Sequence, residues 1–152
     1  MTKVIEKKLY EIAEKIESGY VEVGFKENAR HALTNIPYAT IAFWNEYGTR
    51  KEGESGAIPP RPFFRTMIAN ESPKWSDKIA KGLEFTNFDS EKTLGLLGED
   101  VRGALVESIK NWTTPENAKY TQEKKGFNKP LVETGDMMKA VTATTHKGEM
   151  SD

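Results

Sequence analysis

The longest apolar stripe in the chain constrains the fold more than any other feature. Between residues 90 and 112, large apolar side chains recur every three or four positions: Leu94, Leu97, Val101, Leu105, Ile109 and Trp112. This spacing matches one face of an α-helix, which turns once in about 3.6 residues. The segment 87–90 (Asn-Phe-Asp-Ser) is typical of a turn that caps such a helix. We therefore expect one long helix near 90–112, with its apolar face against a core.

Shorter periodic segments predict further helices. Ile5, Leu9, Ile12 and Ile16 follow one another at spacings of four, three and four, which gives a single apolar stripe that ends at Ser18-Gly19. Prolines that fit a first helical turn, together with similar apolar periods, mark the other helices. We expect these at 37–47, 62–70, 75–83 and, as a short turn, 134–140. In the helix 37–47, we expect Ala39, Ala42, Phe43 and Tyr47 to share one face.

Two segments alternate as half-buried strands do. Val21, Val23 and Phe25 lie on one face of the segment 20–25, and the segment 141–146 alternates similarly. The fold class is therefore α+β, a small antiparallel sheet packed against several helices. Two strands make a poor sheet. Either further strands lie in 26–36 and 120–132, or neighbouring subunits complete the sheet.

Composition narrows the class of protein. A chain of 152 residues predicts a single domain, 1–152. The polar, aperiodic segments 50–57 and 113–129 predict mobile loops.

A net charge of -1 argues against broad electrostatic binding of duplex DNA. The chain has no cysteine, so disulfides and thiolate metal sites are excluded. The uncharged stretch 32–45 is too short to cross a bilayer, and residues 1–8 have no apolar signal core, so we expect a soluble, unexported protein without membrane contact.

Few residues suggest catalysis or cofactor binding. His31 and His146 lack metal-ligand spacing, so we interpret both as surface residues. Glu46 lies on an apolar-rich helix, either as a general base or as a structural anchor that accepts hydrogen bonds from Arg61 or from backbone N–H groups. No nucleotide-binding or nucleophile motif is present. A small basic cluster (Lys124, Lys125 and Lys129) forms either a solvated loop or a phosphate contact. We expect no cofactor and no enzymatic activity.

The segment 42–65 is better suited to an interface. Three prolines restrict the backbone of 58–65 and so fix the directions of Arg61 and two phenylalanines. Aromatic and arginine side chains are the residue types that anchor interfaces. We expect contacts through Trp44, Arg61, Phe64 and Arg65. We expect Glu46, Tyr47 and Phe63 to hold the base of the loop. With Pro62, the interface candidates are Trp44, Glu46, Tyr47, Arg61, Pro62, Phe63, Phe64 and Arg65.

Two ordered motifs in the chain resemble the signature of a family of tailed-phage neck and tail-completion proteins, also described as virion morphogenesis or minor tail proteins. The first motif is Ala-x-x-x-Glu-Tyr-Gly-Thr at 42–49 followed by Ile-Pro-Pro-Arg-Pro-Phe-Phe-Arg at 58–65, in which Pro60 replaces the family's usual small residue. The second motif is Pro-Leu-Val-Glu-Thr-Gly at 130–135, after a Thr- and Lys-rich stretch.

The resemblance implies a structural virion protein of a bacteriophage or prophage, acting at the head–tail joint. It implies a homo-oligomeric ring, a hexamer being favoured, made in the host cytoplasm. Its neighbours would be head-closure or connector proteins and tail-tube or tail-terminator proteins, with transient proximity to genome DNA. The alternatives are a tail terminator or other minor tail component, a small prophage enzyme using Glu46 with Arg61, and a nucleic-acid-binding module using Lys124, Lys125 and Lys129.

Overall fold

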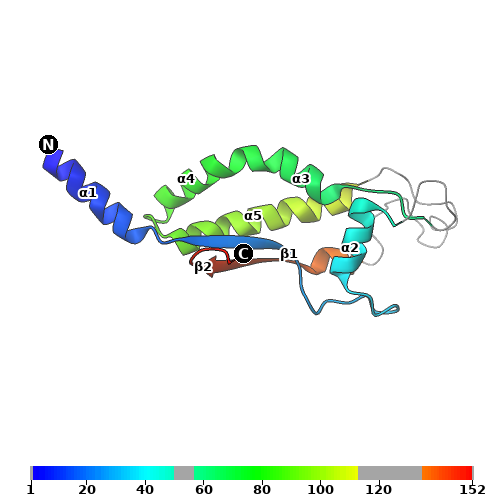
Figure 1. Ribbon diagram of the computed structural model, residues 1–152. Coiled ribbons are helices and arrows are strands. Elements are labelled where there is room, and N and C mark those ends of the chain that lie inside the picture. The colour runs from blue at the N-terminus through cyan, green and yellow to red at the C-terminus, as the bar shows by residue number, and fades with distance from the viewer. Residues whose placement is uncertain (1, 50–56, 113–134, 152) are drawn as a thin grey trace. The chain divides into compact units, whose positions relative to one another are not determined.

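The fold is α+β, as the sequence predicts. The structure is a computed structural model that describes residues 2–49, 57–112 and 135–151 (Figure 1). Its helices are α1 Thr2–Lys15, α2 Tyr38–Tyr47, α3 Phe63–Glu71, α4 Trp75–Phe85, α5 Ser90–Asn111 and α7 Asp136–Lys139, with a 3-10 turn at Ser72–Lys74. Its strands are β1 Gly19–Phe25 and β2 Val141–Lys147. The predicted helices and strands are confirmed, with boundaries moved by a few residues at most.

The sheet consists of β1 and β2, paired antiparallel. The Gly148 N–H donates to the Ser18 carbonyl at 2.8 Å, and the Lys26 N–H donates to the Ala140 carbonyl at 2.9 Å. This register sets Tyr20 opposite His146, and their rings stack with centroids 4.7 Å apart. Of the two alternatives for a larger sheet, a further strand in 26–36 is absent, because that segment forms turns and one isolated bridge between Arg30 and Pro37. The one expected in 120–132 lies outside the described residues.

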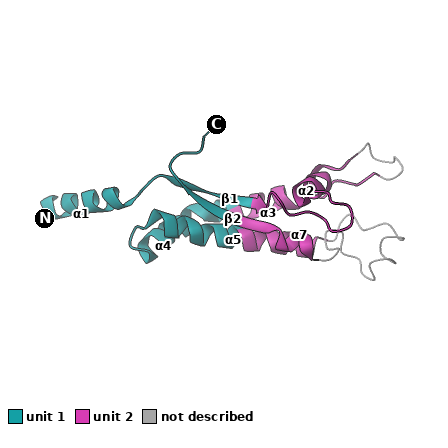
Figure 2. Cartoon of the chain, turned by 90° about the horizontal axis from the view of Figure 1, so that it is seen from below, with its two compact units in different colours: residues 1–23, 72–101, 143–152 teal, residues 24–71, 102–142 magenta. Residues whose placement is uncertain are grey.

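The chain divides into two compact units, coloured separately in Figure 2. The first comprises residues 1–23, 72–101 and 143–152, and the second comprises 24–71 and 102–142. Helix α5 and both strands contribute residues to each unit. That the chain is a single domain stays a prediction. The expected loops at 50–57 and 113–129 fall almost wholly outside the described residues.

In the first unit, α5 lies directly on the strands at Gly98. A Cβ atom at this position would lie 2.6 Å from Val21 Cγ2 and 3.3 Å from Ala143 Cβ, so only glycine fits without a shift of the neighbours. On α4, Lys78 forms an ion pair with Asp100 of α5. The Thr86 and Thr93 hydroxyls, 2.9 Å apart, also join the end of α4 to α5. The long predicted helix is thus packed on the sheet and against α4.

Helix α1, also in the first unit, buries none of its side chains. The apolar stripe predicted from the sequence is present, but Val4, Ile5, Leu9 and Ile16 remain between 45% and 70% exposed. Ile12 is the most covered of the stripe, and it is only half-buried. No part of the described chain therefore covers this apolar face.

The second unit holds the deepest core of the described chain. Phe63 of α3 and Leu105 and Ile109 of α5 are its fully buried large side chains. Ser108 of α5 donates its hydroxyl to the Phe63 carbonyl at 2.8 Å. Tyr38 and Ala42 of α2, Met67 of α3 and Met137 of α7 are also buried. This core fixes α3, and with it the segment 58–65, on a rigid support.

Candidate functional site

The Glu46 carboxylate joins the end of α2 to the start of α3. Its Oε2 accepts the Phe64 backbone N–H at 2.9 Å, and its Oε1 accepts the Arg65 backbone N–H at 3.1 Å. The first N–H groups of a helix have no partner within the helix, and a negative charge is favourable near them. Glu46 therefore acts as a cap on α3, supplied by a different helix. Its predicted role as an anchor for backbone N–H groups is confirmed.

A charged side chain completes this arrangement. The Arg65 Nε–H donates to Glu46 Oε1 at 2.8 Å, and Arg65 Nη2 donates to the Glu46 carbonyl at 3.3 Å. The Arg65 side chain is 56% exposed, whereas the Glu46 side chain is 7% exposed. The Arg65 guanidinium carbon also lies 4.8 Å from the centroid of the Tyr47 ring, within range of a cation–π contact.

The expected shared face of α2 is confirmed, since Ala39, Ala42, Phe43 and Tyr47 all line one side of the helix. Only part of this face is covered, because Phe43 and Tyr47 are 59% and 54% exposed. The buried positions of α2 are Tyr38, Ala42 and Glu46, each four residues apart. The buried position is favourable for the charged Glu46 because its carboxylate has N–H donors on α3.

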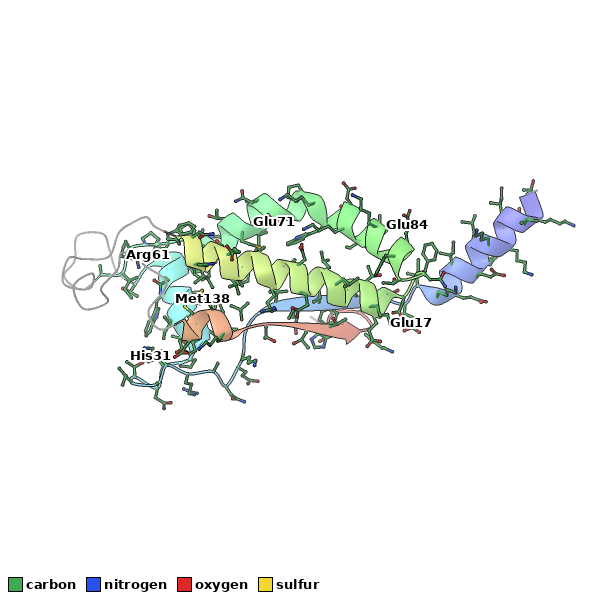
Figure 3. All side chains as sticks on the ribbon, turned by 180° about the vertical axis from the view of Figure 1, so that it is seen from behind. Glu17, His31, Arg61, Glu71, Glu84 and Met138 are labelled. Atoms are coloured by element: carbon green, nitrogen blue, oxygen red, sulfur yellow. The ribbon has the colours of Figure 1, made fainter. Side chains whose placement is uncertain are left out.

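Arg61 is buried beside α2 (Figure 3), where it contacts Asn45. Its Nη1 donates to Asn45 Oδ1 at 3.1 Å, and its backbone N–H donates to the Asn45 carbonyl. Burial lowers the pKa of the Arg61 guanidinium from its ordinary value. Sequence reasoning overlooked Asn45. The sequence does contain an indication, because an asparagine inside an apolar helix is unfavourable unless its side-chain amide makes specific hydrogen bonds.

An open apolar groove, here called the α2–α3 groove, lies between these helices. It has a volume of about 320 Å³. Its floor and rim are formed by Phe25, Ala39, Ala42, Phe43, Glu46, Tyr47, Phe63, Phe64, Arg65 and Ile68. The rings of Phe43 and Tyr47 lie 4.9 Å apart on its α2 side, and Ile68 is exposed on its α3 side. Apart from Glu46 and Arg65, which pair with each other, the lining is apolar or aromatic.

The chain between α2 and α3 is tied together at its base. Gly48 ends α2 with φ 78, and a Cβ atom there would lie 2.8 Å from the Ile58 carbonyl oxygen. The Thr49 N–H donates to that carbonyl at 3.2 Å, and the Ile58 N–H donates to Thr49 Oγ1 at 3.0 Å. Glycine is thus required at position 48 for both its backbone conformation and this close approach.

The structure brings the predicted interface residues together but exchanges two of their roles. Glu46 and Phe63 hold the base of the loop, as expected. Arg61, expected at a contact surface, is only 7% exposed and belongs to the base, whereas Tyr47, expected at the base, is on the surface. Trp44, Pro62 and Phe64 are partly buried. Phe43 and Ile68 are exposed groove residues that sequence reasoning did not select.

The other candidate residues do not line the groove. His31 lies in the turns before α2, where its Nδ1 accepts the Thr34 N–H at 3.3 Å (Figure 3). His146 contacts Glu22 at 2.7 Å on the sheet. Across residues 2–49, 57–112 and 135–151, no group of three or more histidine or acidic side chains is arranged to hold a metal ion. In the same ranges, no helix combines the length and apolar character needed to cross a membrane. Lys124, Lys125, Lys129 and nearly all of the 130–135 motif lie outside the described residues.

Comparison with known proteins adds no relative. No protein-family model matches the chain, and neither the curated proteins nor the solved structures include a match.

Proposed function

We propose that this chain is a structural virion protein of a tailed bacteriophage or prophage, acting as a subunit of a homo-oligomeric ring at the head–tail joint. The proposal includes no catalytic role. It starts from the resemblance of the segments 42–49, 58–65 and 130–135 to the neck and tail-completion family.

The observation that carries the proposal is the α2–α3 groove. The two halves of the first motif, separate in sequence, are held together by Glu46, which caps α3 through Phe64 and Arg65. The motif residues thereby fix a rigid corner whose aromatic side chains remain open on one side. Aromatic side chains with an arginine beside them are typical of interface anchors. A motif that holds exposed aromatic side chains in fixed positions suits a protein that works by binding other subunits.

The same geometry makes Glu46 a poor general base. A general base needs a free acceptor position facing a substrate proton. Both Glu46 oxygens already accept N–H bonds from Phe64 and Arg65, and the carboxylate is buried beneath them. For this reason we prefer a structural role to the enzymatic alternative built on Glu46 with Arg61.

The test is assembly of particles. In a phage or induced prophage that lacks this gene, we expect full heads and separate tails in electron micrographs, and joined particles when the gene is supplied in trans. A tagged copy should be present in purified virions, and a map of the joint should place it in a ring. Normal joining without the gene, with a monomeric protein absent from virions, would exclude the proposal.

A catalytic role is tested separately. Glu46→Gln keeps an acceptor oxygen for α3 and removes the charge that a general base needs. We expect this variant to support joining at or near the wild-type level whenever it folds. A folded Glu46→Gln protein that enters virions but leaves a chemical step of maturation incomplete would favour the enzymatic alternative.

A further inference from the structure

Helix α1 carries an apolar stripe that lacks a partner in the described chain. Ile5, Leu9 and Ile12 occupy positions i, i+4 and i+7 on one side of the helix, and Ile16 extends the line by one turn. Ile5 and Leu9 are 56% and 59% exposed. Amphipathic helices that bind in an apolar groove of another protein commonly use anchor residues at positions i, i+4 and i+7.

The α2–α3 groove has matching dimensions and chemistry. The residues of α2 that line it extend from Ala39 to Tyr47, a length of about 12 Å at ~1.5 Å per residue. On α1, the distance from Ile5 to Ile12 is about 10 Å by the same rise. Three stripe residues therefore span the groove. Glu6 beside the stripe and Arg65 at the groove rim have opposite charges.

We infer that α1 of one copy binds in the α2–α3 groove of a second copy, which makes a head-to-tail contact. The contact is heterologous, since the helix of one copy meets the groove of the other, and repetition of such a contact closes a ring when its rotation permits. The inference rests on the proposed function, because it supplies the contact between subunits of that ring.

Pairing of two α1 helices is the competing arrangement. It would cover the stripes but leave every groove open. Helices of about 12–15 residues are also marginal unless they pack on a larger body. Docking into the groove covers both apolar surfaces with one contact, and it places α1 against a preformed support.

The area of the contact predicts its strength. One short helix in one groove buries less than the ~1,200–2,000 Å² that stable interfaces bury in total. A single contact is therefore weak. A closed ring is tighter, because each subunit is held at two places and the last contact forms within the assembly. We expect assembly that depends steeply on protein concentration.

The test uses two variants of the full chain. The stripe variant is Ile5→Glu with Leu9→Glu, and the groove variant is Phe43→Glu with Ile68→Glu. All four residues are at least 38% exposed, so both variants should keep the wild-type circular dichroism spectrum. We expect the wild type to form a closed oligomer in analytical ultracentrifugation. We expect each variant alone to stay monomeric at tenfold higher concentration.

Mixing the variants separates the two arrangements. An equimolar mixture retains one intact helix and one intact groove per pair, so we expect it to form dimers and nothing larger. Tyr10→Glu and Leu33→Glu alter highly exposed residues outside the stripe and the groove, so they serve as controls that should assemble as the wild type does. Oligomers from the groove variant alone, or no dimer in the mixture, would overturn the inference.

Cross-linking gives a second measurement, since the chain has no cysteine of its own. Mixed Leu9→Cys and Phe43→Cys proteins should form a disulfide-linked dimer, and Leu9→Cys with Leu33→Cys should not. A strong Leu9→Cys homodimer would instead show α1 pairing. These outcomes are independent of particle joining: a protein absent from virions that still forms this contact contradicts only the proposed function, and a virion ring without the contact contradicts only this inference.

Discussion

Removing the Glu46 carboxylate should be the most destabilising change at the α2–α3 corner that leaves the apolar core intact. Glu46→Ala deletes the cap of α3 and leaves the Phe64 and Arg65 N–H groups without their acceptor. Each of these two N–H groups costs about 1 kcal/mol or more when it loses its acceptor, which places the loss at the upper end of the about 0.5–2 kcal/mol range of helix caps or slightly above it. The ion pair adds less than about 1 kcal/mol, because Arg65 is more than half exposed. The expected loss is about 3 kcal/mol.

The loss is measurable by urea and thermal denaturation. For a chain of this length, about 3 kcal/mol lowers Tm by about 6–12 °C. Glu46→Gln keeps an acceptor oxygen and should lose about half as much. A double-mutant cycle with Arg65→Ala should give a coupling energy of about 0.5–1 kcal/mol, since the residues are in direct contact.

A matched control separates the cap from a general effect of removing an acid. Glu107 of α5 is an exposed glutamate that pairs with Lys110 and accepts a hydrogen bond from Asn111. Glu107→Ala should change stability by less than about 0.5 kcal/mol. If Glu46→Ala costs no more than this control, the interpretation of Glu46 as the cap of α3 is refuted.

Substitutions at four further positions test the packing of α5. Gly98→Ala should destabilise the fold by about 1–3 kcal/mol because its Cβ would overlap Val21. Gly103→Ala should stabilise it by about 0.5–1 kcal/mol, because no neighbour lies within 4 Å of the added Cβ. Thermal denaturation should therefore show a lower Tm for the first variant and a higher Tm for the second. Leu105→Ala should cost about 2–5 kcal/mol in urea, since Leu105 is fully buried. Ser108→Ala should cost about 1 kcal/mol by leaving the Phe63 carbonyl without its hydroxyl donor, and Ser108→Thr should recover part of it.

The sequence predicted the helices well because their periods are local properties. The stripe from Leu94 to Ile109 specifies α5 whatever it packs against. Periodicity does not report what covers an apolar face. The stripe through Ile5 and Leu9 gave α1 correctly, but its burial depends on surfaces that the described chain does not supply.

The candidate site was predicted in position but not in detail. The motif residues indicated the corner where α2 and α3 meet. An anchor role was predictable for Glu46, but its partners were not predictable from α2 alone, because the donors belong to Phe64 and Arg65, almost twenty positions away. The pairing of Asn45 with Arg61 was not predictable for the same reason, since these residues are 16 positions apart. Contacts between segments distant in sequence decide which face of a short helix is buried.

The tie between Thr49 and Ile58 has a consequence for how this chain can change over time. Hydrogen bonds between Thr49 and Ile58 join the two ends of this segment, and Glu46 caps α3 after it. The fold therefore depends little on the number of residues between positions 50 and 57. Each doubling of a closed loop costs only about 0.6 kcal/mol. Insertions there should leave the scaffold as it is, which makes the segment a suitable site for grafted tags.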